Sequence, residues 1–373
     1  MGQEAIKLEK QQKSRGRLAF AGVTIAFFIG SGFATGQEIL QYFAAYGSGF
    51  ILVIAVSMFI FLYTNLSFIH AGSAGGLEKS SDIFQYYCGQ YIGRFYDIFV
   101  TLFVYLSYTV MCGGAGSAAA QQFGLPVWVG VCGLAVLTGL TVVGGLRGLV
   151  DVLGKLGPLV ILSILTIGTV TVIRDFAQIK HGIQLISSGS VEVLRVGSNP
   201  ISAAVSYAGF VMMWFCTFMA ELGRENPPRL VRSGMCIGGG AIAVTLTMMS
   251  LALLANLHEV VAVEIPSVAL AAKISPAFAT CFALITMLGS YTASVPLLWT
   301  ASNRFAREKT PRFTSVTLLL AALGAVVALF LPYRKLVNIV YGISGYVGVL
   351  LIFFILARDA RTFFTLHRQH TKS

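Results

Sequence analysis

Charged residues are scarce in this sequence. Asp, Glu, Lys and Arg together make up 11% of the chain, whereas a soluble domain carries about 25%. Hydrophobic residues make up 56%. A chain with this balance cannot cover a surface that faces water, so we expect an all-α membrane protein. Its 373 residues allow roughly ten spans of about twenty residues and leave little for soluble domains.

Cysteine pairs and metal-binding patterns are also missing. The six cysteines are scattered singly, no Cys-x-x-Cys pair occurs, and the five histidines lack the spacing of a metal site. We interpret the cysteines as small core residues and expect no metal and no organic cofactor. No nucleophile with a neighbouring base is recognisable, so an enzyme is the least favoured class.

The net charge of +11 is spread along the chain, because the basic residues punctuate the apolar runs and form no patch. The expected partners are therefore a lipid bilayer and a small-molecule substrate, and not nucleic acid. The oligomeric state is open. Residues 1–17 are polar and basic, and the apolar run behind them is too long for the core of a signal peptide.

Ten apolar runs predict ten transmembrane helices. We place them near residues 18–46, 50–70, 93–121, 126–146, 149–173, 200–222, 230–256, 276–303, 313–331 and 334–357. With the N-terminus inside, twenty of the 26 Lys and Arg residues fall in cytoplasmic segments and six outside. This bias predicts an inner-membrane protein with both termini cytoplasmic. We expect a cytoplasmic segment 1–17, a single transporter domain 18–357 and a cytoplasmic tail 358–373.

Polar stretches separate some of these runs. The stretch from Gly72 to Gly93 has room for a short surface helix. Two long loops, 174–199 and 257–275, are expected outside. The second contains Ile265-Pro266-Ser267 followed by apolar residues. It is either a short helix that dips back toward the protein or an ordinary surface loop.

The first run carries Gly30-Ser31-Gly32 in its middle, with Thr35-Gly36-Gln37-Glu38 beyond. Glycine and serine weaken a helix, and unwound backbone at membrane depth is tolerated where it is buried in protein or lines a cavity. Its amides would suit a carboxylate and its carbonyls a cation. The alternative is close helix packing through small residues.

The sixth run carries Ser206-Tyr207-Ala208-Gly209-Phe210 in a matching place. Runs one and six correspond if the protein is two five-span halves, about 18–173 and 200–357, the second inverted. Matching interruptions in two such halves indicate a transport site near the midplane. We therefore predict a 5+5 inverted repeat with broken helices one and six.

Hydroxyl groups in two other runs lie at similar depths. Tyr105 and Tyr108 are in the third run, and Gly289-Ser290-Tyr291-Thr292-Ala293-Ser294 is in the eighth. Ser290 and Ser294 share a helix face and could bind Na⁺ together with unwound carbonyls. Alternatively, these hydroxyls bond to the backbone of their own helix.

Glu38 is the only acidic residue clearly inside a run. An intramembrane carboxyl is by default a functional candidate, and here it could carry a proton, pair with a cation or face a water-filled vestibule. Lys155, near the start of the fifth run, is expected to snorkel to the cytoplasmic interface; the alternative is that it reaches inward and its ammonium group replaces a sodium ion.

These motifs resemble the amino acid–polyamine–cation superfamily, which shares the 5+5 fold. Gly30-Ser31-Gly32 is similar to the glycine-rich break of amino-acid permeases. Arg147-Gly148-Leu149-Val150-Asp151, with Lys155 and Pro158, is distantly similar to the entry of span five in neurotransmitter:sodium symporters. The strongest likeness is to the YkvI-type permeases, in which the run from Ile29 to Glu38 looks characteristic.

The resemblance implies a central site. Amides at Gly30, Ser31 and Gly32 would hold a substrate carboxylate, Tyr105 or Tyr108 would close over it, and Ser206 to Phe210 would complete the pocket. The implied sodium site takes carbonyls near Ala26 and Ile29 and residues of run eight. These are Gly289, Ser290, Thr292, Ala293 and Ser294.

Two departures leave Na⁺ or H⁺ coupling open. Gly36 stands about where the symporters carry the arginine of their outer gate, and Ala293 follows Thr292 where they carry an adjacent hydroxyl pair. The favoured function is a secondary transporter of an amino acid or a related carboxylated solute, working by alternating access. The alternatives are a channel, which would favour repeated pore helices, and a non-transporting membrane sensor or assembly factor on a transporter fold.

Overall fold

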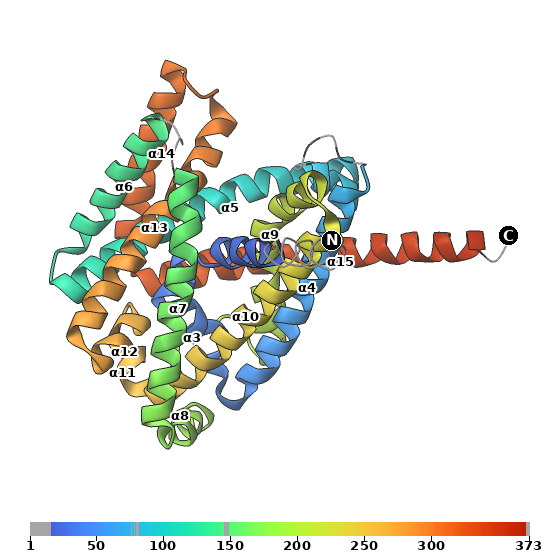
Figure 1. Ribbon diagram of the computed structural model, residues 1–373. Helices are drawn as coiled ribbons and strands as arrows, with labels where there is room; N and C mark the ends of the chain where they lie inside the picture. The colour runs from blue at the N-terminus through green and yellow to red at the C-terminus, as the bar shows by residue number, and fades with distance from the viewer. Residues whose placement is uncertain (1–15, 76, 78, 80–81, 145–148, 371–373) are drawn as a thin grey trace, which may run out of the picture.

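The computed structural model describes residues 16–75, 77, 79, 82–144 and 149–370, except for the side chains of Ser31, 149–158 and 363–370. This part of the chain is all-helical and contains no strand (Figure 1). It opens with the N-terminal helix Gly16–Phe28. The elements that follow are α2 (Ser31–Thr35), α3 (Gln37–Tyr42), the 3-10 helix η1 (Ala44–Gly49), α4 (Phe50–Ser73), α5 (Ile83–Phe123), α6 (Val127–Gly144), α7 (Leu149–Asp175), α8 (Gln178–Ser187), α9 (Pro200–Glu225), α10 (Pro228–Ala255), α11 (Leu257–Val261), α12 (Pro266–Ile274), α13 (Pro276–Phe305), α14 (Pro311–Phe330) and α15 (Tyr333–His370).

Eight of the described helices are long and apolar enough to cross a membrane: α4, α5, α6, α9, α10, α13, α14 and α15. A ninth crossing is obtained if α7 is taken together with α8, which bends away from it by 96°. The first predicted span is divided into shorter pieces. Large apolar side chains such as Phe59, Leu140 and Phe353 are exposed on the outer faces. The chain is therefore a multi-pass membrane protein, and the count of ten spans stays a prediction.

The long helices form two packed groups (Figure 1). In the first group, α4 packs on α9, and α10 packs on α4. The N-terminal helix joins this group, because Gly234 and Gly238 of α10 lie against its residues Phe20 and Ala21. In the second group, α5, α6, α13 and α14 pack together around a separate hydrophobic cluster. The broken first span lies where the two groups meet, since α2 contacts α5 and α13 of the second group and α3 contacts α9 and α10 of the first.

The sixth predicted span is a single helix, and our prediction of a break at Ser206–Phe210 is wrong. α9 runs without interruption from an Asn199 capping box to Glu225. Its glycine serves close packing instead: a Cβ atom on Gly209 would collide with the carbonyl oxygen of Gly345 in α15. Small residues allow two membrane helices to approach this closely.

Two of the polar stretches between the predicted spans, 257–275 and Gly72 to Gly93, contain helices. The loop after α10 holds α11 and α12, and residues Pro266 to Val268, Leu270 and Ala271 of α12 are buried. α12 packs against α13, α7 and α2, so the alternative of a helix that dips back into the protein is confirmed. Before span three, a short helix beginning at Ile83 is separated from the rest of α5 by a kink at Gly89.

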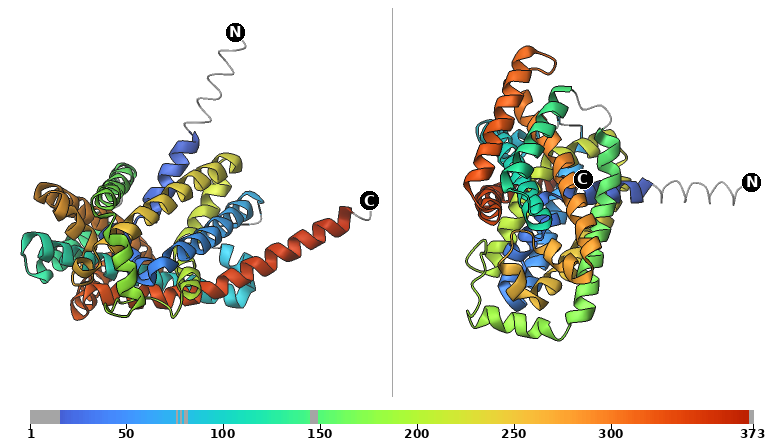
Figure 2. Two further views of the ribbon diagram at one scale, coloured as in Figure 1. Left: turned by 90° about the horizontal axis from the view of Figure 1, so that it is seen from below. Right: turned by 90° about the vertical axis from the view of Figure 1, so that its left-hand side faces the viewer.

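Both ends of the described chain lie at the same end of the bundle. Gly16 lies beside Leu230 at the start of α10, and Arg232 of α10 contacts His70 near the end of α4 at 3.2 Å. Asp359 of α15 accepts hydrogen bonds from two hydroxyl groups of α4. α15 then runs on past the other helices (Figure 2). This arrangement agrees with an even number of crossings.

Candidate functional site

The first span is broken at Gly30, as the sequence predicts. The N-terminal helix ends at Phe28, and Gly30 is extended, with φ −92° and ψ 177°. α2 begins at the next residue without a side-chain cap. Five residues later Gly36 adopts the left-handed conformation, with φ 81°, and α3 starts. A left-handed turn of this kind favours glycine because it has no Cβ atom.

The break is covered by side chains from the middle of two long helices. A Cβ atom on Gly30 would lie 3.0 Å from Cη2 of Trp214 in α9 and 3.4 Å from Cε of Met111 in α5. Trp214 lies near the centre of the 26-residue α9. The break is therefore enclosed at mid-depth between the two helix groups.

The carboxyl group of Glu38 reaches back to the break. The turn at Gly36 reverses its side chain so that Oε2 lies 2.7 Å from the Cβ position of Gly32. Cε2 of Tyr341, in α15, lies 2.9 Å from the same point. The hydroxyl of Tyr207 donates a hydrogen bond to Oε1 of Glu38 at 2.8 Å. Sequence separation alone placed Glu38 beyond the site, whereas the structure places it inside.

Glu38 is enclosed without a cationic partner in the described part of the chain. Only 2% of the residue is exposed. None of the ion pairs observed for the described lysines and arginines includes it, and its hydrogen-bond donor Tyr207 is an uncharged hydroxyl. A buried carboxylate is costly unless it is paired, so this position is suited to a proton or an incoming cation.

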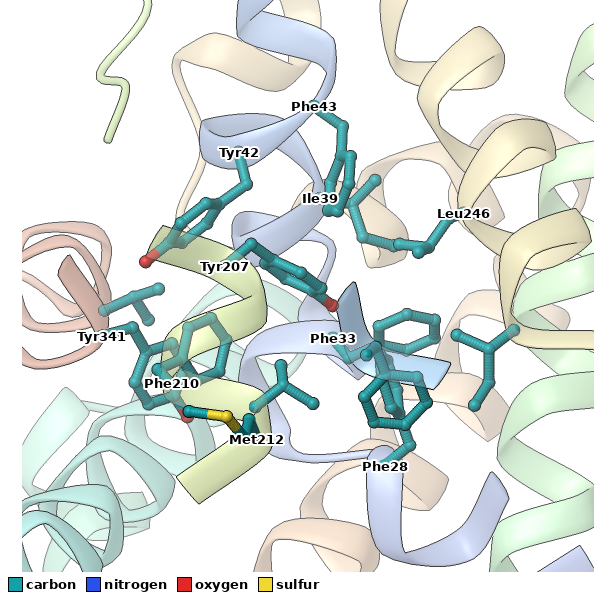
Figure 3. Close-up of a cluster of buried hydrophobic side chains, with 14 of the residues drawn as sticks. Phe28, Phe33, Ile39, Tyr42, Phe43, Tyr207, Phe210, Met212, Leu246 and Tyr341 are labelled. Carbon is teal, nitrogen blue, oxygen red and sulfur yellow. The ribbon is translucent and has the colours of Figure 1, made fainter. Parts of the chain in front are cut away.

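Aromatic rings pack around Tyr207, the hydrogen-bond donor to Glu38 (Figure 3). The ring of Tyr207 lies 5.1 Å from that of Tyr42 and 4.7 Å from that of Phe43, both edge-on. Phe210, one helix turn further along α9, stacks on Tyr341 at 4.7 Å. Tyr207 and Phe210, two of the predicted site residues, therefore do face the broken span even though their helix is continuous.

The two aromatic side chains that meet Gly30 and Gly32 each bury a polar atom without a hydrogen-bond partner in the described chain. These atoms are the hydroxyl oxygen of Tyr341 and the indole nitrogen of Trp214. Most buried polar atoms in proteins are paired with protein or water. The Tyr341 hydroxyl thus has unused hydrogen-bonding capacity close to Gly32, where Cε2 of its ring lies, whereas the part of Trp214 that meets Gly30 is the six-membered ring.

The predicted tyrosines of span three point elsewhere. The hydroxyl of Tyr105 donates to the carbonyl of Leu320 at 3.1 Å, and that of Tyr108 donates to the carbonyl of Ala321 at 3.4 Å. Both acceptors are in α14. Met111, one turn beyond Tyr108, is the residue of this helix that meets the break.

The predicted ion-binding hydroxyls bond to their own helix. Ser290 donates to the carbonyl of Thr286, Thr292 to that of Gly289, and Ser294 to that of Tyr291, at 2.8–3.0 Å. This is the alternative that the sequence left open. α13 nevertheless packs against α2, so the helix that carries these residues is a neighbour of the broken span. A sodium site with the carbonyls of Ala26 and Ile29 stays a prediction.

Three residues at the break were missed from sequence: Met111, Trp214 and Tyr341. Tyr341 belongs to the last span, which carried no recognised motif. A usable signal was its place beside Gly342, Gly345 and Gly348, a small-residue pattern that indicates a closely packed helix. Trp214 and Met111 have no comparable signal. The span-five motif cannot be assessed, because Arg147 and the side chains of Asp151, Lys155 and Pro158 lie outside the described residues.

Comparison with known proteins identifies the fold of this chain. No family model matches the chain. Two solved structures share its fold over 90% of its length. One is a mutant of the manganese transporter of Eremococcus coleocola, with 16% identity, 76% of that chain covered and a TM-score of 0.53. The other is MhsT in complex with L-phenylalanine, with 13% identity, 88% covered and a TM-score of 0.59. The chain therefore has a multi-pass membrane transporter fold.

A relative in sequence is the membrane protein YkvI of Bacillus subtilis (strain 168). It is 24% identical over 367 residues, which cover 95% of this chain and 98% of YkvI. The similarity thus extends over nearly the full length of both chains. By their names, the proteins that this chain resembles are thus a membrane protein, a manganese transporter and a protein that binds L-phenylalanine.

Proposed function

We propose that this protein is a secondary transporter of a small organic solute, an amino acid or a related carboxylated compound, which it moves by alternating access. The observation that carries the proposal is the break at Gly30, which is enclosed at mid-depth and lies beside a buried carboxyl group and the ring of Tyr341, whose hydroxyl is unpaired in the described chain. Broken membrane helices with polar groups at the midplane are the usual solute sites of secondary transporters.

The lining of the break favours an organic solute. The groups that meet there are aromatic rings, one carboxyl group and the backbone of α2. Small-molecule sites typically combine apolar and aromatic walls with a few polar groups. MhsT, which binds L-phenylalanine, shares the fold, and this likeness supports an amino-acid-like solute. In the proposed binding mode, the amides of Ser31 and Gly32 hold its carboxylate.

The two helix groups support the proposal of an inverted repeat. If the chain consists of two five-span halves, spans three and eight correspond, as do spans four and nine. The structure packs α5 on α13 and α6 on α14, so each of these spans contacts its proposed counterpart. Rocking of one helix group against the other would then expose the break to each side in turn.

Coupling to Na⁺ or H⁺ and cytoplasmic termini belong to the same proposal. The cation groups are the hydroxyls of α13 for Na⁺ and Glu38 for H⁺. The excess of Lys and Arg in the assigned cytoplasmic segments supports the orientation. Reporter fusions at the C-terminus test the orientation, and a periplasmic reporter would overturn it.

The function is tested in two stages with purified protein. A thermal-shift screen against amino acids, amines and nucleobases, with and without Na⁺, identifies a ligand. Uptake of that ligand into proteoliposomes is then measured under an imposed Na⁺ or pH gradient. We expect saturable accumulation that one of the two gradients drives. Binding without any flux would instead identify a sensor on a transporter fold.

A further inference from the structure

We propose that Glu38 binds the amino group of the transported solute, so that the site selects solutes that carry an ammonium group. This inference rests on the proposed function and specifies its substrate class. The structural basis is the convergence of the Glu38 carboxyl group, the Tyr341 ring and the unpaired Tyr341 hydroxyl at the broken first span.

One oxygen of the Glu38 carboxyl group is directed toward the break. Oε1 accepts the hydrogen bond of Tyr207, which fixes the orientation of the group. Oε2 is the oxygen that faces Gly32. An ammonium group beside α2 would meet this oxygen, and its three donors could also reach the unpaired hydroxyl of Tyr341. Charge-assisted hydrogen bonds of this kind are about twice as strong as neutral ones.

The surroundings favour an organic ammonium group over Na⁺ at this position. Hard metal cations take several oxygen ligands in their first shell, as Ca²⁺ does. The rings of Tyr42, Phe43 and Phe210 pack against Tyr207, which is the hydrogen-bond donor to Glu38. The Na⁺ candidates of α13 are separate groups on another helix.

The charge of the site also favours a solute that carries an ammonium group. The described part of the chain supplies no cation for Glu38, so a bound ammonium group would supply the missing charge. A zwitterionic amino acid would place its carboxylate at the start of α2 and its ammonium group at Glu38. A carboxylic acid without the amine would bring a second negative charge close to Glu38, and like charges at this distance repel strongly.

The test uses matched ligand series on the wild-type protein in detergent. For alanine, leucine and phenylalanine, thermal shifts are measured with the L-amino acid, the amine lacking the carboxylate and the acid lacking the amine. We expect stabilisation by amine-bearing members of at least one series and none by the matching deaminated acids. Equal responses to a deaminated acid, or no response to any amine-bearing compound, would overturn the proposal.

Variants locate the effect. Glu38→Gln keeps the shape and one acceptor oxygen but removes the negative charge, and should weaken binding of the amine-bearing ligand about tenfold or more. Glu259→Gln makes the same change at an exposed carboxyl group and should leave affinity unchanged. If Glu38→Gln cannot be purified folded, the wild-type series still decides. Unchanged affinity in folded Glu38→Gln contradicts the assignment.

A comparison of Na⁺ with choline shows whether Glu38 binds Na⁺ or an ammonium group. If Na⁺ alone, compared with choline, stabilises the wild type and this response is lost in Glu38→Gln, Glu38 binds the ion and the ammonium proposal fails. Failure of the proposed function is seen differently. Amine-selective binding without flux would disprove transport and retain the ammonium site. Flux of deaminated acids at the same rate as flux of the matching amino acids would disprove the ammonium site and retain transport.

Discussion

Substitution of Gly32 by alanine provides a sharp test of the site, because the structure specifies what the added methyl group meets. It would lie 2.7 Å from Oε2 of Glu38 and 2.9 Å from Cε2 of Tyr341, well inside ordinary contact distance. Both neighbours are fully enclosed, so both must shift. Overpacking of this kind costs about 1–3 kcal/mol. If the strain falls on the bound state, affinity should decrease by roughly tenfold per 1.4 kcal/mol.

The assay is equilibrium binding of the ligand found by thermal shift, together with the melting temperature of each variant. Gly240 of α10 is a matched control, because it is exposed and a Cβ atom there meets nothing within 4 Å. Gly240→Ala should stabilise the helix slightly, by about 0.5–1 kcal/mol, and leave binding unchanged. Gly32→Leu should abolish binding. If Gly32→Ala and Gly32→Leu bind like wild type, the site does not lie at this break.

Three further outcomes are expected. Gly209→Ala should destabilise the protein by about 1–3 kcal/mol, measured by thermal unfolding, because its methyl group would collide with the backbone of α15; a neutral result would contradict the close packing. Gln121 makes two hydrogen bonds of 2.8 Å to the backbone of Ile265, just before α12. Gln121→Ala should therefore loosen α12 and speed the maleimide labelling of a cysteine placed at the buried Ser267, and equal labelling rates would refute this. Glu38→Gln should remove any pH dependence of uptake if Glu38 carries the coupled proton, since glutamine cannot titrate; an unchanged pH profile eliminates that role.

The sequence predicted the helical elements well because each depends on local composition. Every apolar run coincides with a helix or a group of helices, and the weak helix at Gly30-Ser31-Gly32 is indeed broken. Gly209 shows the limit of such reasoning. A glycine looks the same in sequence whether its helix unwinds or packs closely, and the difference depends on α15, more than 130 residues away.

Side-chain directions within the site depend on tertiary structure. Tyr105 and Tyr108 lie on the helix predicted for span three, but the rotation of α5 turns them toward α14. Glu38 reaches Gly32 only because Gly36 adopts a left-handed turn. Neither the helix rotation nor the turn can be derived from hydrophobic periodicity in helices that are apolar on most faces.

Solute counterflow tests the central claim most directly, because exchange across the membrane does not depend on which ion drives net transport. Proteoliposomes are loaded with unlabelled ligand, and the entry of labelled ligand is followed for wild type, Gly32→Leu and Gly240→Ala. We predict a transient overshoot of label with wild type and Gly240→Ala, and none with folded Gly32→Leu. Counterflow that persists in Gly32→Leu, or that is absent from a wild type that binds the ligand, would contradict transport through the break in the first span.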